Sequence, residues 1–174
     1  MLKNRFPSAG AAAVVSEAVE PALPPEYARV YRSTAGGCVD VHPTHGKQEL
    51  KQNLLIALFL ADRGEHVCLL PVSTAEGAKN PDATRNGLLW EFKTPEGHTS
   101  NAVDKALRDG SKQADCILLQ LPMDFDLVAL KRGLRGRVRR VETIQEVALL
   151  LHDKLQHFTR HEILGEGFGE QLRT

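Results

Sequence analysis

The stretch that decides the fold is residues 80–95, which read NPDATRNGLLWEFKTP. Asn86 and Gly87 separate two short runs that have the composition of strands. Both residues accept the positive φ values that a two-residue type I′ turn requires. The stretch is therefore predicted to form a β-hairpin, with residues 80–85 in its first arm and residues 88–95 in its second.

The polar residues of this hairpin are expected to gather on one side of it. Side chains alternate between the two faces of a strand, so Glu91 and Lys93 should share one face. Trp90 and Phe92 should share the opposite, apolar face. With Asp82 on the first arm, two carboxylates and one ammonium group then lie together, which is typical of a site for a metal ion and a phosphate.

The chemistry of such a site explains the residue types. Hard divalent cations such as Mg²⁺ bind oxygen, usually from one or two carboxylates together with water and phosphate oxygens. Asp82 and Glu91 are the predicted metal ligands, and the backbone carbonyl of Phe92 is a further candidate. Lys93 is suited to stabilise charge on a phosphate or to help deprotonate an attacking water. The same Glu-X-Lys pattern also occurs on exposed strands, where alternating charges keep a sheet edge soluble.

The composition fits one domain and sets few other limits. A length of 174 residues with 42% hydrophobic residues is ordinary for a single core. The 22 basic and 22 acidic side chains balance, so any attraction to nucleic acid must be local. No apolar run approaches the roughly 20 residues of a membrane span. The cysteines, Cys38, Cys68 and Cys116, are odd in number and widely spaced, which favours reduced thiols over a disulfide framework or a zinc knuckle.

The N-terminal part differs in composition from the rest. Residues 1–35 are expected to form a linker or N-terminal extension, with a short helix at residues 14–19, because prolines interrupt any longer helix. Residues 36–164 are expected to form the folded domain, and residues 165–174 a flexible tail. His42 and His45 lack Cys or carboxylate partners at ligand spacing, so they are interpreted as surface histidines rather than metal ligands.

A helix is predicted over residues 46–63, where apolar side chains recur at helical spacing and Gly64 follows as the terminating residue. Glu49 falls on the same stripe as Asn53 and Ile56, so it should face the protein. A first-turn glutamate that interacts with the helix N-terminus is the ordinary interpretation. Beside the carboxylates of the hairpin, however, Glu49 is expected to be the third carboxylate of the site.

The other segments are assigned from their hydrophobic pattern. The expected elements are a buried strand at 65–71, a helix from about residue 100 to 110, a strand at 114–122, a short helix at 124–133, a possible strand at 137–141 and an amphipathic helix at 143–157. The order helix, three strands, helix, strand predicts an α/β fold in which a central mixed sheet is flanked by helices.

These motifs follow one another in the order of a known family. They are Gly46-X-X-Glu49, Leu60-Ala61-X-Arg63-Gly64-X-X-Val67, Asn80-Pro81-Asp82, Trp90-Glu91-Phe92-Lys93-Thr94-Pro95 and Lys112-Gln113-Ala114-Asp115. Over roughly residues 36–145 the chain resembles the C-terminal tRNA nuclease domain of contact-dependent growth inhibition toxins of the CdiA type. That domain falls in the PD-(D/E)XK nuclease superfamily.

The resemblance implies a PD-(D/E)XK fold and metal-assisted cleavage of tRNA in the cytoplasm of a bacterial target cell. It also implies a cognate immunity protein that blocks the toxin. The catalytic set carried over by position is Glu49, Asp82, Glu91 and Lys93. The neighbours of the site that would bind substrate are Thr94, Ser100, Lys112 and Gln113.

Other functions fit the same residues. Active-site residues of the superfamily do not encode which nucleic acid is cut, so a DNA endonuclease from a mobile element is one alternative. A non-catalytic module that binds nucleic acid or protein and retains the fold is another. If RNA is the substrate, cleavage can proceed by hydrolysis or by attack of the 2′-hydroxyl on its own phosphate.

Residues 131–140, KRGLRGRVRR, form the one dense cationic run of the sequence. Neutralisation of phosphates by Lys and Arg supplies most non-specific affinity for nucleic acid. The predicted substrate-binding cations are Arg135, Arg137 and Arg139 in this run, with Lys105 and Lys112 extending the basic surface toward the hairpin. A solvated face or a contact with an immunity protein explains the run equally well.

Overall fold

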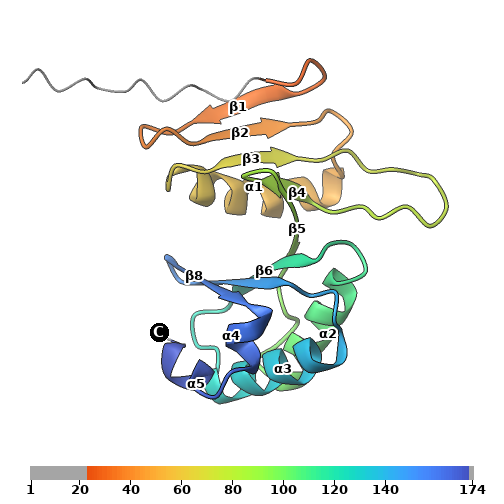
Figure 1. Ribbon diagram of the computed structural model, residues 1–174. Coiled ribbons are helices and arrows are strands. Elements are labelled where there is room, and N and C mark those ends of the chain that lie inside the picture. The colour runs from red at the N-terminus through yellow and green to blue at the C-terminus, as the bar shows by residue number, and fades with distance from the viewer. Residues whose placement is uncertain (1–22, 173–174) are drawn as a thin grey trace, which may run out of the picture.

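The computed structural model describes residues 23–172 (Figure 1), and the helix expected at residues 14–19 lies outside them. The strands are β1 (Ala28–Arg32), β2 (Cys38–Val41), β3 (His66–Leu69), β4 (Ala83–Arg85), β5 (Leu88–Lys93), β6 (Cys116–Leu121), β7 (Glu146–Leu151) and β8 (Lys154–Thr159). The helices are α1 (Lys47–Ala61), α2 (Ser100–Gly110), α3 (Leu127–Arg140), α4 (Arg160–Leu164) and α5 (Phe168–Gln171). None of these described helices is long and apolar enough to cross a membrane.

In the described part of the chain, eight strands form one mixed sheet in the order β1 to β8. The pairs β2–β3, β5–β6 and β6–β7 are parallel, and the remaining pairs are antiparallel. Figure 1 shows β4 and β5 between an upper group, β1–β3 with α1, and a lower group that contains β6, β8 and the other helices. The predicted order from α1 to β6 and the central sheet flanked by helices are confirmed. The hairpin lies in the middle of the sheet, where side chains from both groups can meet.

The two faces of the sheet carry separate apolar cores. Leu60 of α1 and Phe92 of β5 belong to one core, which lies on the α1 face. Ile117 of β6 belongs to the other core, together with buried residues of α2, α3, α4 and α5. Glu91 is the register partner of Ile117, and Lys93 follows it at the two-residue period of a strand. Both polar side chains therefore point away from α1 and toward the face that carries α2.

The predicted hairpin turn is confirmed by its backbone angles. Asn86 has φ 48° and Gly87 has φ 85°, the sign that a type I′ turn requires at both positions. The closing pair of the hairpin is Arg85 with Leu88. The turn chemistry encoded by two residues thus sets the register in which β4 pairs with β5.

Two predicted elements at the C-terminal side are wrong. The expected strand at 137–141 is the end of α3, which is longer than the helix predicted at 124–133. Asp126 caps α3 by accepting a hydrogen bond of 2.8 Å from the N–H of Val128. Leu130, Leu134 and Val138 recur every four residues and are buried, so their helical period continues through the basic run.

The amphipathic helix expected at 143–157 is a β-hairpin, β7–β8. The apolar residues 147–151 are buried throughout, because their side chains alternate between the two apolar cores on the opposite faces of the sheet. His152 has a φ of 59° in the turn between the two strands. A strand that is buried on both faces does not alternate between apolar and polar residues. Its continuous apolar run was therefore interpreted as one face of a helix.

The folded structure is wider than the expected range of residues 36–164. Residues 28–32 form β1, which pairs with β2 at the edge of the sheet. Phe168 of α5 is fully buried, and its ring meets the ring of Phe158 edge to face with 5.1 Å between centroids. Pairing and packing therefore include parts of the segments expected to be a linker and a tail.

Candidate active site

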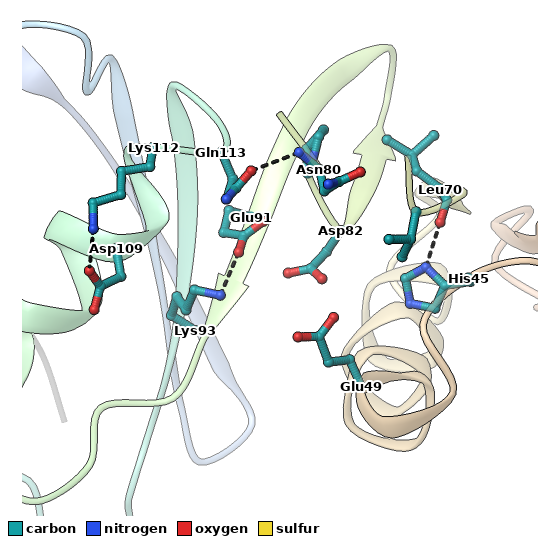
Figure 2. Close-up of a pocket in the computed structure, with 12 residues that line it drawn as sticks. His45, Glu49, Leu70, Asn80, Asp82, Glu91, Lys93, Asp109, Lys112 and Gln113 are labelled. Atoms are coloured by element: carbon teal, nitrogen blue, oxygen red, sulfur yellow. Dashed lines mark hydrogen bonds and ion pairs between the residues drawn. The ribbon is translucent and has the colours of Figure 1, made fainter. Parts of the chain in front are cut away.

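The four predicted catalytic side chains converge on one cavity beside the β4–β5 hairpin (Figure 2). The cavity has a volume of about 410 Å³ and is lined by Glu49, Asp82, Glu91 and Lys93, among others. Glu49 comes from the first turn of α1, Asp82 from the residue before β4, and the other two from β5. Residues from both groups of the sheet thus meet at its middle strands.

Asp82 is held in one orientation by two hydrogen bonds. Its Oδ2 accepts a bond of 2.8 Å from the backbone N–H of Phe92, and its Oδ1 accepts one of 2.8 Å from Nδ2 of Asn53 in α1. The pairing of β4 with β5 ends at Ala83 and Trp90, so the carboxylate occupies the next position along the ladder. The side chain is buried and its orientation is set by the sheet and by α1 together.

Glu91 is the buried carboxylate at the centre of the site, with 3% exposure. Its Oε1 lies 2.5 Å from Nζ of Lys93. Its Oε2 is buried and has no hydrogen-bond partner among the described residues. Burial, and then the charge of Asp82, raise the pKa of Glu91 to about 7. A buried carboxylate oxygen without a partner is costly, and a bound cation would satisfy it.

Lys93 is partly buried against these acids. Burial works against its ammonium form, but the hydrogen bond that Lys93 donates to Glu91 and the charges of Glu91, Asp82 and Glu49 outweigh burial and raise the pKa of Lys93. Its amine therefore carries a positive charge at neutral pH. The site consists of a cation held among three acidic side chains, with one carboxylate oxygen still unsatisfied.

Glu49 completes the acidic set from the side of α1. It is exposed and lines the main cavity, as well as an adjoining one of about 190 Å³ that it shares with Asp82 and Lys93. Figure 2 shows its carboxylate pointing toward Asp82. The charge of Glu49 contributes to the raised pKa of both Glu91 and Lys93. Glu49 is thus near enough to act on the same ion or on the water around it.

His45 was missed by the sequence interpretation, which placed it on the surface and is wrong. It is 5% exposed and lines the cavity. Its Nδ1 lies 2.7 Å from the carbonyl oxygen of Leu70, and its Nε2 lies 3.2 Å from Nδ2 of Asn53. A carbonyl only accepts, so Nδ1 carries the proton and Nε2 accepts from Asn53. Asn53 stood on the stripe of Glu49 in the sequence, but no sequence signal indicated that His45 is buried.

Lys112 and Gln113 line the same cavity, as predicted neighbours of the site should. Oε1 of Gln113 accepts a hydrogen bond of 2.7 Å from the backbone N–H of Asn80. Lys112 forms an ion pair of 3.0 Å with Asp109 on the end of α2. Both side chains therefore form part of the wall on the α2 side, and Lys112 is exposed enough to meet a ligand.

Thr94 and Lys105 line a neighbouring cavity of about 250 Å³ that shares Lys93 with the main one. Lys105 is exposed and forms an ion pair of 2.8 Å with Glu96. Ser100 lies elsewhere, because it begins α2 and its carbonyl oxygen faces Gly133 of α3. Of the predicted neighbours, Ser100 is the one that the structure places at a contact between helices.

The three predicted arginines lie along α3 and do not line the cavity of Lys93. Nε of Arg135 donates to the carbonyl of Ile163 at 3.0 Å, and Nε of Arg137 donates to Oδ1 of Asp104 at 3.2 Å. Arg139 is exposed and lines a separate groove of about 390 Å³. Two of these arginines thus hold helices together, and their role in substrate binding stays a prediction.

A comparison with protein families finds a match over part of the chain. Residues 79–151 match the family of the contact-dependent growth inhibition CdiA C-terminal domain. The match spans β4 to β7 and includes Asp82, Glu91 and Lys93, whereas Glu49 precedes it. The resemblance drawn from the order of the motifs is therefore confirmed at the level of this family.

One solved structure extends the comparison to the fold. It is a CdiA-CT/CdiI toxin and immunity complex from Burkholderia pseudomallei, and its similarity has a TM-score of 0.51 with 18% sequence identity. The similar region covers 64% of this chain and 85% of that chain. At this identity the likeness concerns the fold. No curated protein sequence matches the chain.

Proposed function

We propose that the chain is a metal-dependent nuclease with a PD-(D/E)XK site, which acts as a toxin by cleaving tRNA in the cytoplasm of a bacterial target cell. The observation that carries the proposal is Oε2 of Glu91, buried without a partner beside Asp82 in a cavity that Lys93 also lines. The CdiA family match supports the toxin assignment. The order of the motifs over residues 36–145 supports tRNA as substrate.

The residues present fit a divalent cation such as Mg²⁺. The donors are all oxygens: the carboxylates of Asp82 and Glu91 and the backbone carbonyl of Phe92. The N–H of Phe92 donates to Asp82, and the N–H and C=O of one strand residue point toward the same neighbour. The carbonyl of Phe92 therefore lies on the Asp82 side. When bound, the cation would lower the pKa of a coordinated water and offset charge on the phosphate.

The other side chains have separate roles in the proposed reaction. Lys93 binds a phosphate oxygen and stabilises the charge that develops on it. Glu49 orients water at the open side of the cavity. Asn53 is a positioning residue, because it fixes Asp82 through the bond of 2.8 Å. Product termini identify the route of cleavage, since attack by the 2′-hydroxyl leaves a 2′,3′-cyclic phosphate and hydrolysis does not.

Substrate would be recognised through its backbone and shape. Aromatic residues make up 5% of the sequence, which leaves little surface for base stacking. Lys105 and Lys112 stand on the α2 side of the cavities that meet at Lys93. These two exposed lysines are the proposed first contacts for phosphates that flank the scissile bond. Arg139 would extend the surface over α3.

A cognate immunity protein is the proposed protein partner. In the similar structure from Burkholderia pseudomallei, the toxin is bound to its immunity protein. For this chain the proposal predicts that a small protein encoded beside it binds it and suppresses cleavage. Loss of cleavage in a stoichiometric mixture would support the assignment.

The nuclease proposal is tested by cleavage of total tRNA and of plasmid DNA, in Mg²⁺ and after EDTA. We expect the parent to cleave tRNA, and Glu91→Gln and Lys93→Met to lose about 100-fold or more. Glu142→Gln and Lys51→Met are matched controls at exposed positions and should retain parent rates. Equal rates in parent and site variants would refute the site, and cleavage of DNA alone would refute the tRNase assignment. Binding of tRNA without cleavage would identify a binding module.

A further inference from the structure

A second group of potential ligands lies at the other end of the sheet, on β2 and β3. Cys38 and Asp40 of β2 are register partners of His66 and Cys68 of β3, and the two strands are parallel. The side chains between them along each strand belong to the core under α1. All four residues therefore point to the face opposite α1, where β2 and β3 run side by side (Figure 1).

The donor atoms of this group are already close together. One donor atom each from Cys38, Asp40 and His66 lies within 4.8 Å of the others. Sγ of Cys68 is 3.3 Å from Nε2 of His66 and 3.9 Å from Oδ2 of Asp40. Neighbouring ligands of a tetrahedral Zn²⁺ are separated by about 3.3–3.8 Å, given its usual bond lengths to N, O and S. The two sulfur distances are close to that range.

The hydrogen bond between His66 and Asp40 must open before both side chains can bind one ion. Nε2 of His66 lies 2.7 Å from Oδ2 of Asp40, which is a hydrogen bond rather than a pair of metal ligands. Arg29 holds the same carboxylate through bonds of 2.7 Å to Oδ1 and 2.9 Å to Oδ2. An ion that replaces the His66 hydrogen bond leaves the arginine in place as an outer partner that orients the ligand.

Burial separates this group from an ordinary surface cluster. Asp40 is fully buried, and Cys38 and Cys68 are buried beside it. Neither cysteine is in a disulfide. The sequence spacing of the cysteines does not resemble a zinc knuckle, because the pairing of two parallel strands, rather than a short loop, brings the donors together.

We propose that Cys38, Asp40, His66 and Cys68 form a structural site for a thiophilic divalent cation, with Zn²⁺ as the fitting ion. Two thiols and an imidazole favour Zn²⁺ over Mg²⁺, which prefers oxygen donors. The site is distinct from the acidic cavity at Glu91. The bound ion would link β2 to β3, next to the edge strand β1. It would thereby stabilise the part of the sheet on which α1, the helix that carries Glu49, is packed.

The test is spectroscopic and does not depend on nuclease activity. The full chain is freed of metal with a chelator and titrated with Co²⁺ and then Zn²⁺. We expect a sulfur-to-cobalt charge-transfer band that saturates at one equivalent and is bleached by Zn²⁺, and a rise in Tm with Zn²⁺. Cys68→Ser and Cys38→Ser should each weaken or abolish the band, whereas Cys116→Ser, at another buried thiol, should retain it.

Each outcome decides the proposal. Glu91→Gln should keep the cobalt band while losing cleavage, so failure of the nuclease site and failure of the zinc site are distinguishable. Absence of the band in the parent chain overturns the zinc site, whatever the variants do. A band that survives in both Cys68→Ser and Cys38→Ser also overturns it, because the thiolates would then lie elsewhere.

Discussion

Oδ2 of Asp82 accepts a hydrogen bond of 2.8 Å from the backbone N–H of Phe92, which ties the residue before β4 directly to β5. Strand pairing ends one step earlier, at Ala83 and Trp90. The carboxylate therefore takes the place of the next backbone partner in the ladder. The geometry of the acidic pair is therefore set by the sheet and not by the loop that precedes β4.

The other oxygen of Asp82 depends on Asn53, which leads to a first prediction. Asn53→Ala leaves Oδ1 of Asp82 and Nε2 of His45 without their buried donor. We expect the free energy of unfolding to fall by about 1–3 kcal/mol. The Mg²⁺ concentration needed for half-maximal cleavage should rise by about 10-fold or more, as for other residues that orient a metal ligand.

Urea denaturation and cleavage at varied Mg²⁺ measure the two effects of Asn53→Ala. Lys51→Ala, at an exposed position of the same helix, is the control and should change neither. An unchanged Mg²⁺ requirement in a destabilised Asn53→Ala protein would show that Asn53 supports the fold but does not position Asp82 for the reaction.

The raised pKa of Glu91 predicts the pH dependence of stability. Burial and the charge of Asp82 raise this pKa from 4.5 to about 7. Between these two values the folded chain holds a proton that the unfolded chain has lost. Stability from this group therefore falls as pH rises through that window and levels off above it, by up to about 3 kcal/mol. Urea unfolding from about pH 5 to about pH 8 should show this slope in the parent and not in Glu91→Gln.

The proton on Glu91 should also make metal affinity depend on pH, but metal affinity should rise with pH where stability falls. A cation and a proton compete for the Glu91 carboxylate, so apparent Mg²⁺ affinity should rise by up to about 10-fold per pH unit until the pKa near 7 is passed. Calorimetric titration over this range measures it. An affinity that is flat with pH would mean that Glu91 does not ligate the ion.

The parts of the fold and site that the sequence predicted are those with local signals. Asn86 and Gly87 encode the turn, and the two-residue period of a strand then places Glu91 and Lys93 together. The helix of Glu49 was visible in its apolar stripe. The sequence could not show whether these segments come together in space. In the structure, Glu49, Glu91 and Lys93 line one cavity.

The missed features depend on partners far away in the sequence. His45 is buried, and its ring bonds to the carbonyl of Leu70, 25 positions along the chain. The β7–β8 hairpin was hidden because β7 is buried on both faces of the sheet, so its sequence shows no alternation. The basic run was interpreted as a surface, but Arg137 reaches Asp104 on α2, and a charge run carries no sign of such a partner.

Two glycines of α3 form a matched pair for a packing prediction. A Cβ on Gly133 would lie 2.7 Å from the carbonyl oxygen of Ser100 and 2.7 Å from Cβ of Val103, where α2 and α3 cross. Gly133→Ala should therefore cost about 1–3 kcal/mol of unfolding free energy. A Cβ on Gly136 would meet only the side chain of Arg140, at 3.7 Å. Gly136→Ala should be neutral or stabilise the helix by up to about 1 kcal/mol.

Thermal or urea unfolding of the two alanine variants tests the close approach of α2 and α3. Equal stabilities for Gly133→Ala and Gly136→Ala would show that the helices can separate at little cost. A large loss in Gly133→Ala with normal cleavage would place the effect in packing, because the residue lies away from the acidic cavity.

Arg137 and Arg139 of α3 have different surroundings, so their alanine variants should separate an effect on stability from an effect on binding. Arg137 is largely buried and bonds to Asp104 through Nε and Nη2, so Arg137→Ala should lower the free energy of unfolding by about 1–3 kcal/mol. Arg139 is exposed, and Arg139→Ala should change stability by no more than about 0.5 kcal/mol.

Arg137→Ala should have the larger effect on stability, whereas Arg139→Ala should have the larger effect on RNA affinity. If α3 belongs to the substrate surface, Arg139→Ala weakens tRNA binding and reduces the slope of log affinity against log salt by about 1. Filter binding over a salt series, with the inactive Glu91→Gln as background, measures this slope without cleavage. An Arg139→Ala protein with parent affinity and slope would remove α3 from the substrate surface. The phosphate contacts would then fall to Lys105 and Lys112, which stand beside the acidic cavity and whose ion pairs with Glu96 and Asp109 are exposed enough to exchange for phosphate.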